Sequence, residues 1–474
     1  MKYHILPIYR QGAKLSQDLR IRIPLGICHQ STASSQRSKP GSHDLKQNLP
    51  PHSLLPTPML VRSLLVSTIS SNKVLLPAIL KLLNTLATSQ MWLFDVKRNI
   101  ILRTILKRTF YQHFCAGENE REVKNTIKNI KDMGFKGVIL TYAREIVVDA
   151  TEEEKGSGTV QFPPKTTGRA AISFNPNIES WRSGVMETVE MVSENDILAL
   201  KFTGAGHMVS EALAKGQALP NQMMKALEQI CSRALERKVR IFVDAEQQSV
   251  QPGIDAVALD LMKKYNHKGT ATVYNTYQAY LTIAPSTILD HLRIASGENF
   301  TLGVKLVRGA YMKSEPRHII HKTKEDTDNA YDSITTAILG RRFGDLTETG
   351  LGSSKFPSVE MFLATHNKES TLKAYEHYQS QTDTGGRAVP IEFGQLLGMA
   401  DEVSCNLLQL KLKAERTGNR YVPQVYKCLS WGALSDCISY LVRRAVENRD
   451  AVTRNRVERN ALRTEMWRRL SIRR

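Results

Sequence analysis

The sequence predicts an α/β fold, a distorted (β/α)8 barrel of the TIM type with an N-terminal helical arm. Three observations support this prediction: eight short apolar runs recur along the chain, helical patterns separate them, and the joints between them are short. Such alternation is typical of parallel sheets, and eight strand–helix units are the number that closes a TIM barrel. An open doubly wound sheet remains the alternative, because periodicity does not reveal strand order.

The distribution of charge limits the classes of partner. The 474 residues carry a formal charge of +19, and residues 1–116 contain sixteen Lys or Arg against three acids. Residues 440–474 contain eleven Arg against four acids, and the middle of the chain is nearly balanced. A basic excess at the ends, without an aromatic–basic binding module, predicts no nucleic-acid partner. A nucleic-acid- or lipid-binding protein stays the alternative that the net charge motivates.

Residues 1–57 are predicted to be a mitochondrial transit peptide or a disordered segment. The stretch is rich in Arg, Lys and Ser, and its only acids are Asp18 and Asp44. This composition is typical of transit peptides, although a merely disordered basic tail shares it. The segment therefore favours a mitochondrial location.

Residues 58–135 are predicted to form the helical arm. The part from 58 to 110 is apolar and basic, and Arg62, Lys73 and Lys81 interrupt its apolar runs. Because a membrane-spanning helix needs roughly 18 to 20 consecutive apolar residues, no spanning helix is expected. Basic amphipathic helices also bind anionic lipid, so peripheral contact with the inner mitochondrial membrane stays open.

The barrel is predicted over residues 136–450. Its strand-like runs lie at 138–142, 197–203, 239–245, 271–280, 301–307, 359–365, 389–393 and 425–431. Helical patterns lie between them and after the last, among them 208–216, 220–238, 253–265, 285–296, 368–380 and 433–449. A basic helix or tail is predicted at 451–474.

Two patterns that could bind metal are weak. The six cysteines show neither CxxC spacing nor a zinc-ligand pattern, which predicts reduced thiols without disulfides or a metal cluster. His318 and His321 have i, i+3 spacing, but no third ligand is fixed beside them. Surface histidines are therefore the favoured interpretation, and no metal is predicted.

A glycine turn after the second strand-like run resembles a dinucleotide-binding loop. Gly204 and Gly206 follow the strand and open a helix, but Val209 occupies the position of the third glycine. Without that glycine the helix cannot pack as closely on the strand, so the match is weak. A nicotinamide-dependent dehydrogenase built on this turn stays a competing hypothesis.

Polar residues stand at the ends of the strand-like runs, where barrel enzymes place their catalytic groups. These residues are Lys201, Asp244, Glu246, Gln278, Lys305, Arg308, Thr365, His366 and Asn367. Lys201 is flanked by apolar residues, and an unpaired ammonium group is costly to bury. It must reach a carboxylate such as Asp244 or an anionic ligand. A structural Lys201–Asp244 ion pair and a role in a site are both compatible with the pattern.

The last helical pattern carries a second cluster. Tyr440, Arg443, Arg444 and Glu447 stand at i, i+3, i+4 and i+7 and so share one helical face. Two adjacent guanidinium groups suit a small carboxylate, which arginine binds in a bidentate fork, and Glu447 would orient one of them. A solvated charged face is the alternative interpretation.

Seven ordered motifs together resemble one family. They are ALKFTGAG (199–206), FVDAEQ (242–247), YQAYL (277–281), KLVRGAY (305–311), ATHN (364–367), EFGQLLGM (392–399) and YLVRRAVENR (440–449). The chain from about 120 to 450 resembles the proline dehydrogenase family in its eukaryotic, monofunctional form. The resemblance implies a barrel that binds FAD, oxidises L-proline to (S)-1-pyrroline-5-carboxylate, passes electrons to a quinone, and works in the mitochondrial matrix or on the matrix side of the inner membrane.

The resemblance also implies roles for individual residues. Arg443 and Arg444 would bind the proline carboxylate with Lys201, and Tyr440 would close against the ring. Asp244 and Lys305 would be the catalytic pair, with Asp244 near the amine and Lys305 beside the reactive nitrogen of the flavin, and Tyr311 would lie near the substrate. The residues that match flavin contacts are Gln278, Lys305, Arg308, Gly309, Ala310, Thr365 and His366.

One position departs from the family pattern. Cys428 stands where bacterial members commonly carry tyrosine, at a position associated with substrate choice. Discrimination between proline and hydroxyproline is therefore open.

Overall fold

A computed structural model describes the following residues: 49–72, 74–88, 96, 98–142, 174–267, 269–342, 344, 355–382, 388–435, 437–438, 440–442, 444 and 452–472. The chain divides into two compact units, residues 1–49 and Pro50–Arg474, and the elements below belong to the second. Most of the predicted transit peptide, residues 1–48, lies outside the described residues.

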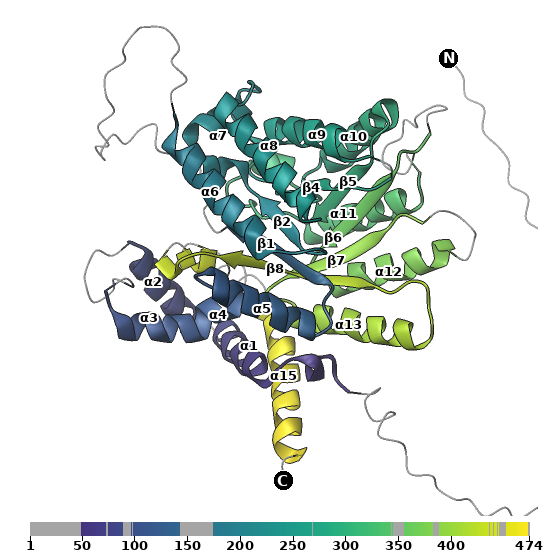
Figure 1. Cartoon of the computed structure of the whole chain (residues 1–474). Coiled ribbons are helices and arrows are strands. Elements are labelled where there is room, and N and C mark those ends of the chain that lie inside the picture. The colour runs from purple at the N-terminus through teal and green to yellow at the C-terminus, as the bar shows by residue number, and fades with distance from the viewer. Residues whose placement is uncertain are drawn as a thin grey trace, which may run out of the picture. The chain divides into compact units, whose positions relative to one another are not determined.

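Eight parallel strands close into a barrel in the order in which they follow one another in the sequence (Figure 1). They are β1 (Gly137–Tyr142), β2 (Ile197–Leu200), β3 (Arg240–Val243), β4 (Val273–Gln278), β5 (Leu302–Val307), β6 (Val359–Ala364), β7 (Ile391–Leu396) and β8 (Gln424–Trp431). The first and last strands pair from Gly137 opposite Tyr426 to Tyr142 opposite Trp431. This closure confirms the predicted (β/α)8 barrel and excludes the open sheet.

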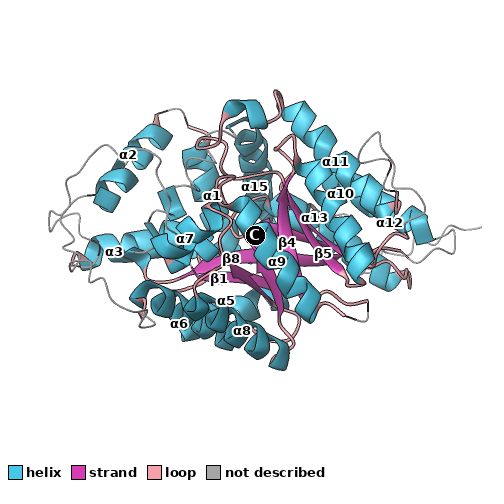
Figure 2. Cartoon of the chain, turned by 90° about the horizontal axis from the view of Figure 1, so that it is seen from above, coloured by secondary structure: helices cyan, strands magenta, loops and turns pink. Residues whose placement is uncertain are grey.

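Helices cover the outside of the barrel (Figure 2). They are α5 (Glu120–Asp132), α6 (Pro176–Met191), α7 (His207–Ala214), α8 (Asn221–Glu236), α9 (Gln251–Tyr265), α10 (Ala284–Glu298), α11 (Lys324–Leu339), α12 (Lys368–Thr382) and α13 (Asp401–Arg416). α8 shows why these segments are helical, since its buried Met223, Leu227 and Ile230 recur at helical spacing. The described residues between 434 and 444 are also helical.

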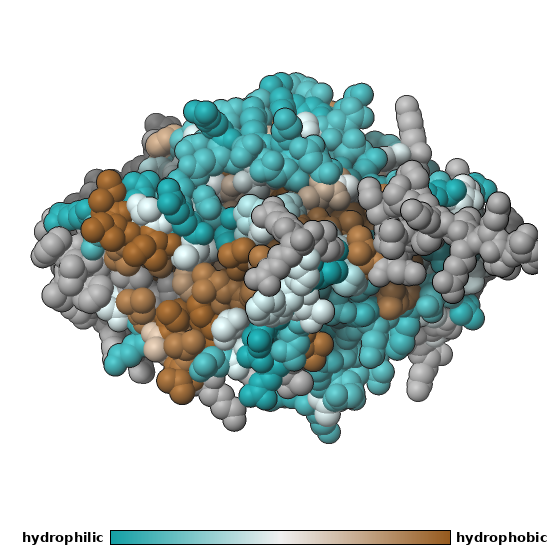
Figure 3. All heavy atoms as spheres, turned by 90° about the horizontal axis from the view of Figure 1, so that it is seen from below, coloured by the Kyte–Doolittle hydropathy of each residue, from teal (hydrophilic) through white to brown (hydrophobic). Residues whose placement is uncertain are grey.

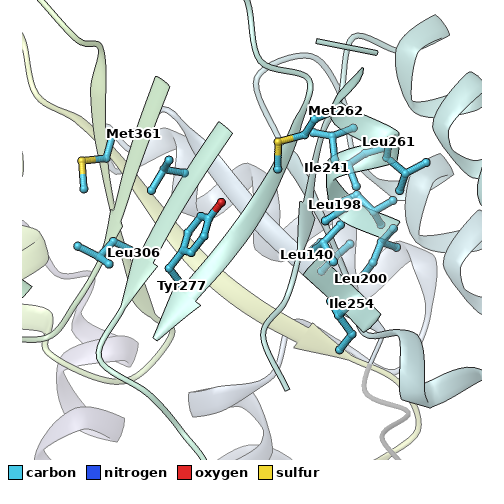
Figure 4. Close-up of a cluster of buried hydrophobic side chains, with 14 of the residues drawn as sticks. Leu140, Leu198, Leu200, Ile241, Ile254, Leu261, Met262, Tyr277, Leu306 and Met361 are labelled. Carbon is cyan, nitrogen blue, oxygen red and sulfur yellow. The ribbon is translucent and has the colours of Figure 1, made fainter. Parts of the chain in front are cut away.

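The core has two shells because each strand is buried on both faces. In β2, Leu198 and Leu200 pack outward under the helices, and Ile197 and Ala199 pack into the barrel. Figure 4 shows Leu198 and Leu200 together with other outward-facing residues such as Leu140 and Ile241. Burial on both faces explains why the strands read in the sequence as continuous apolar runs.

A polar network fills the barrel near the amino ends of the strands. Arg240 on β3 lies between the rings of Tyr274 and Tyr426, with its guanidinium carbon 5.8 and 5.5 Å from their centroids. It donates a hydrogen bond of 2.5 Å to Glu392, and Tyr274 donates one of 2.5 Å to Glu360. These contacts block this end, so a ligand approaches from the carboxyl ends of the strands.

The N-terminal elements of this unit are helical. They are η2 (Pro51–Leu54), α1 (Thr57–Ser70), α2 (Leu75–Thr88), α3 (Ile100–Leu106), a π-helical turn η3 (Lys107–Tyr111) and α4 (Gln112–Phe114). α1 packs along the C-terminal helix α15 (Val452–Ile472), and the two lie side by side in Figure 1. Among the described residues, no single helix is both long and apolar enough to cross a bilayer. Residues 57–70 and 75–82 meet the length and composition test only as a pair bent by 103°.

Candidate active site

A cavity of about 380 Å³ opens at the carboxyl ends of the strands. It collects twelve of the fourteen site residues predicted from the sequence: Lys201, Asp244, Gln278, Lys305, Arg308, Gly309, Ala310, Tyr311, Thr365, His366, Tyr440 and Arg444. The other two, Arg443 and Glu447, lie outside the described residues. Residues separated by up to 243 positions in the sequence thus line one cavity, as expected for the mouth of a parallel barrel.

Three charged groups meet on one wall of the cavity. Lys305 donates a hydrogen bond of 2.5 Å to Asp244 Oδ1, and Lys201 Nζ lies 3.5 Å from Asp244 Oδ2. Burial by itself would raise the pKa of Asp244, but the two ammonium groups outweigh burial and lower it. Asp244 is therefore a carboxylate at neutral pH, and the three groups together carry one excess positive charge.

Gln278 and Gly309 form a second wall. Gln278 Nε2 donates to the carbonyl of Glu246 at 3.0 Å, and its Oε1 accepts from the amide of Ala310 at 3.4 Å. Gly309 has φ of +143°, and a Cβ placed on it would lie 1.9 Å from the ring of Tyr280. Only glycine fits this backbone, which lets the chain pass close over the tyrosine ring.

Arg308 is held from behind the cavity. Its Nε donates to Asp328 at 2.8 Å, one terminal nitrogen donates to Ser370 at 2.9 Å, and the other donates to Thr365. The guanidinium carbon also lies 4.3 Å from the centroid of the Tyr331 ring. These contacts fix the direction of a positive group at the cavity edge before any ligand arrives.

His366 has a defined tautomer. Its Nε2 accepts a hydrogen bond of 3.2 Å from the backbone amide of Leu396, so in the neutral ring the proton sits on Nδ1. The neighbouring Gln395 donates to the carbonyl of Thr365 at 3.4 Å and accepts from Ser404 at 2.9 Å. The last two residues of β7 thereby orient the histidine that follows β6.

The helix that follows β8 closes another side. Tyr440 and Arg444 are both buried, and the Arg444 guanidinium carbon lies 5.0 Å from the Tyr440 ring centroid. Cys428 lines the same cavity, and burial raises the pKa of its thiol to about 11. The thiol is therefore neutral and adds a small, uncharged patch among charged groups.

Sequence reasoning missed four polar residues that line the cavity: Thr141, Thr276, Gln395 and Ser430. Gln395 lies within the quoted motif EFGQLLGM, and a polar residue just before the end of a buried strand was the signal that could have identified it. Thr141, Thr276 and Ser430 lie inside β1, β4 and β8, where alternation alone does not distinguish the barrel interior from the helix side.

The competing motifs fall elsewhere. Gly204 and Gly206 lie in the short 3-10 turn η4 (Phe202–Ala205) and at the start of α7, and Val209 is fully buried in the hydrophobic core. His318 lies within the turn η5 (Arg317–Ile319) and is exposed, and His321 follows two residues after the turn. Neither pair lines the cavity at the mouth of the barrel.

A closed parallel barrel whose ionisable groups gather at the carboxyl ends of its strands is the arrangement of a (β/α)8-barrel enzyme. Comparison with known protein families shows which family of barrel enzymes the chain resembles. The model of the family described as proline dehydrogenase matches residues 123–457, which is more than half of the chain. The chain therefore belongs to the proline dehydrogenase family, as the seven motifs predicted.

Relatives of similar length carry related names. The chain is 29% identical over 399 residues to a probable mitochondrial proline dehydrogenase of Schizosaccharomyces pombe, covering 76% of this chain and 80% of the relative. It is 30% identical to proline dehydrogenase 1, mitochondrial, of Arabidopsis thaliana, covering 79% and 77%. It is also 28% identical to a hydroxyproline dehydrogenase of Mus musculus, covering 77% and 83%.

Solved structures share the fold at low sequence identity. Proline utilization A (PutA) of Bdellovibrio bacteriovorus, inactivated by N-propargylglycine, matches 81% of this chain with a TM-score of 0.57 and 16% identity. A bifunctional PutA protein matches 87% with a TM-score of 0.52 and 16% identity. The chain spans 38% and 42% of these two proteins, so the likeness concerns the barrel fold alone.

Proposed function

We propose that this protein is an FAD-dependent proline dehydrogenase that oxidises L-proline to (S)-1-pyrroline-5-carboxylate, the first step of proline catabolism to glutamate. The observation that carries the proposal is the gathering of Lys201, Asp244, Lys305 and Arg444 around one cavity in a chain of this family. These groups can bind a carboxylate and a nitrogen at the same time.

The residues of the cavity fit a flavin. Its volume of about 380 Å³ falls in the range of small-molecule sites, and its lining combines apolar groups with a few fixed polar ones. Gln278, Arg308, Gly309, Ala310, Thr365 and His366 would hold the cofactor, with the positive charge of Lys305 beside it. When bound, FAD would supply the acceptor for the hydride that leaves the ring carbon next to the proline nitrogen.

Arg444 would fix the substrate carboxylate. Its buried guanidinium and the ammonium group of Lys201 line the same cavity. Arg443 is predicted to complete the clamp and Glu447 to orient it, while Tyr440 and Tyr311 would close against the ring. Binding a carboxylate through forked donors fixes the position of the reacting carbon, which lowers the entropic part of the barrier.

Asp244 would hold the amine. Because its pKa is lowered, the carboxylate stays charged and can accept a hydrogen bond from the proline nitrogen while Lys201 and Lys305 balance its charge. The excess positive charge of the three groups would stabilise negative charge that develops in the cavity during the reaction. Asp244 and Lys305 are therefore the proposed catalytic residues.

We further propose that the electrons pass on to a quinone and that the protein works in mitochondria, in the matrix or on the matrix side of the inner membrane. The basic composition of residues 1–57 supports the location, and several relatives carry mitochondrial names. A quinone is membrane-soluble, so this acceptor requires at least transient contact with a bilayer.

The visible absorption spectrum of the purified protein, recorded anaerobically before and after addition of L-proline, tests the proposal. We expect a flavin spectrum that bleaches with proline. A flavin spectrum that does not bleach would mean that the substrate is a compound other than proline. A colourless protein that cannot be reconstituted with FAD would overturn the proposed chemistry.

The variant Arg444→Met tests the carboxylate clamp. We expect flavin to be retained and the proline concentration needed for half-bleaching to rise by roughly a hundredfold, because a charge-assisted pair is lost. Arg463→Met, which removes an exposed arginine of α15, is the matched control and should bleach like the unaltered protein. Unchanged proline affinity in Arg444→Met would show that Arg444 does not bind the proline carboxylate.

A further inference from the structure

Apolar side chains lie exposed on the N-terminal helices. They are Val61 and Leu65 of α1, Val74 and Leu75 at the start of α2, and Ile100, Ile101 and Ile105 of α3, and we call them the arm surface. Ile100 and Ile101 are 76% and 71% exposed. α2 and α3 lie near each other in Figures 1 and 2, and Figure 3 shows brown areas on that side of the lower face. An apolar cluster of this kind marks an interaction site.

α1 leaves apolar side chains exposed while it buries polar ones together with Leu60 and Val66. It buries Ser63, Ser67 and Ser70, and Ser63 donates a hydrogen bond of 3.0 Å to the buried carboxylate of Asp401. Its Val61 and Leu65 point outward and are 49% and 41% exposed. The exposed face of an ordinary amphipathic surface helix is polar, whereas that of α1 includes these two apolar residues. The outward face of α1 therefore suits an apolar environment.

Exposed cations border the arm surface, and the nearest acids after α3, Glu118 and Glu122, pair with two other basic residues of α3 and η3. Among the described residues from 50 to 117 there is no Asp or Glu, while Lys81 and Arg108 are exposed. On α3 and the turn that follows, Ile101, Ile105 and Arg108 stand at i, i+4 and i+7, so two apolar groups and a cation share one face. Apolar residues bordered by cations are the pattern of a segment that lies in the surface of an anionic membrane.

We propose that the arm surface docks this protein on a bilayer with anionic headgroups. The isoleucines of α3 enter the boundary between headgroups and acyl chains, and Lys81 and Arg108 face the anionic groups. The inference rests on the proposed function in one respect, since the proposed electron acceptor, a quinone, is dissolved in the membrane. The surface itself is independent of the reaction.

A second copy of the chain is a poorer occupant of this surface. Two arm surfaces facing each other would bring like charges together, which opposes association. The centres of protein–protein interfaces are depleted of charged residues, whereas Arg108 shares its helical face with Ile101 and Ile105. The negative charge of a lipid surface complements the same arrangement.

Vesicle sedimentation with the full chain tests the proposal. We expect binding to phosphatidylcholine vesicles that contain about 30 mol% phosphatidylglycerol, weak binding to phosphatidylcholine alone, and loss of binding as salt rises. The variant Ile101→Ser/Ile105→Ser keeps every charge and should lower the partition coefficient by at least about tenfold. Lys81→Gln/Arg108→Gln should lower binding to the anionic vesicles alone.

The matched control is Met224→Ser/Leu235→Ser, which removes two apolar side chains that are 39% exposed on α8. It should bind like the unaltered protein, and thermal unfolding shows whether each variant is folded. Equal binding of both isoleucine and control variants would overturn the proposal. The proposal would also be overturned if the isoleucine variant still bound vesicles but no longer self-associated in light scattering.

Oxidation of proline with a soluble dye acceptor separates this inference from the proposed function. Dye reduction that is unchanged in Ile101→Ser/Ile105→Ser while vesicle binding falls supports a docking role. Absence of dye reduction in the unaltered protein would remove the proposed function, and vesicle binding would still report on the arm surface.

Discussion

The ammonium group of Lys305 reaches across the barrel mouth and donates a hydrogen bond of 2.5 Å to Asp244. Lys305 belongs to β5 and Asp244 follows β3, so the contact passes over β4, which lies between these strands in the barrel. Lys201, after β2, approaches the same carboxylate from the other side at 3.5 Å. One carboxylate therefore links the ends of three strands and fixes two cations in the cavity.

Replacing Asp244 by asparagine tests this arrangement. The change preserves size but leaves two ammonium groups without a counter-charge, so kcat/KM for proline should fall by roughly 30-fold or more. Because the pKa of Asp244 is lowered from an ordinary value of about 3.9, the carboxylate stays ionised above that pH. Removing it should therefore leave the acid side of the activity profile above pH 5 unchanged in shape. If activity falls on the acid side above pH 5 in the unaltered protein and this fall disappears in Asp244→Asn, the pKa of Asp244 is raised and not lowered.

Gly309→Ala should abolish flavin binding or weaken it severely. The residue has φ of +143°, and an added Cβ would lie 1.9 Å from the Tyr280 ring. The backbone of this wall would have to move, and with it the amide of Ala310 that contacts Gln278. Flavin content per protein, read from the absorbance spectrum, is the measurement. Gly297→Ala on α10, where an added Cβ meets nothing within 4 Å, is the control and should keep its flavin.

Lys427→Met should destabilise the fold by about 3 to 5 kcal/mol, because it leaves Asp401 buried without its cation. Lys427 and Asp401 are each 2% exposed and are joined by a hydrogen bond of 2.9 Å. Urea unfolding gives the free energy of unfolding. The double variant Lys427→Met/Asp401→Leu should lose less stability than the sum of the losses in the two single variants. The exposed pair Lys264–Glu228 is the control, and Lys264→Met should cost less than about 1 kcal/mol. If the stability losses of the two single variants add up to that of the double variant, Lys427 and Asp401 do not stabilise each other.

His113 predicts a fall in stability on mild acidification. Burial lowers its pKa to about 4, below the ordinary value of about 6.5 that it regains on unfolding. Between these values the unfolded chain binds a proton that the folded chain does not, so stability is complete above pH 6.5 and falls toward pH 4. At 1.36 kcal/mol per pH unit the loss is about 3 kcal/mol. Urea unfolding of His113→Gln across this range should show a flatter slope than the unaltered protein.

The eight strands could be predicted because of their burial. Strands of a parallel barrel are covered on both faces, so β2 and β5 appear as short, mainly apolar runs that can be recognised without knowing their partner strands. Lys201 and Lys305 were conspicuous for the same reason, since each interrupts or ends such a run. Position along a strand therefore identified cavity residues before their neighbours were known.

Gln395 and the cavity residues Thr141, Thr276 and Ser430 could not be selected in this way. Their orientation depends on the tilt of their strands in the closed barrel, and an apolar run in the sequence does not reveal which side chains face the interior. The domain boundaries at 57, 135 and 450 and the roles of Arg443 and Glu447 stay predictions.

The sequence by itself determined the number of strands and their places along the chain, the family, and which polar residues end the strands, because burial pattern and motif spacing are properties of a linear chain. Only the tertiary structure decided that Lys305 is the nearest partner of Asp244 and that α1 turns its serines inward toward Asp401. The first depends on barrel closure and the second on the packing of α1 against the start of α13, which bring together groups that are 61 and 338 positions apart. Such pairings follow from distance and dielectric surroundings, which exist only after the chain has folded.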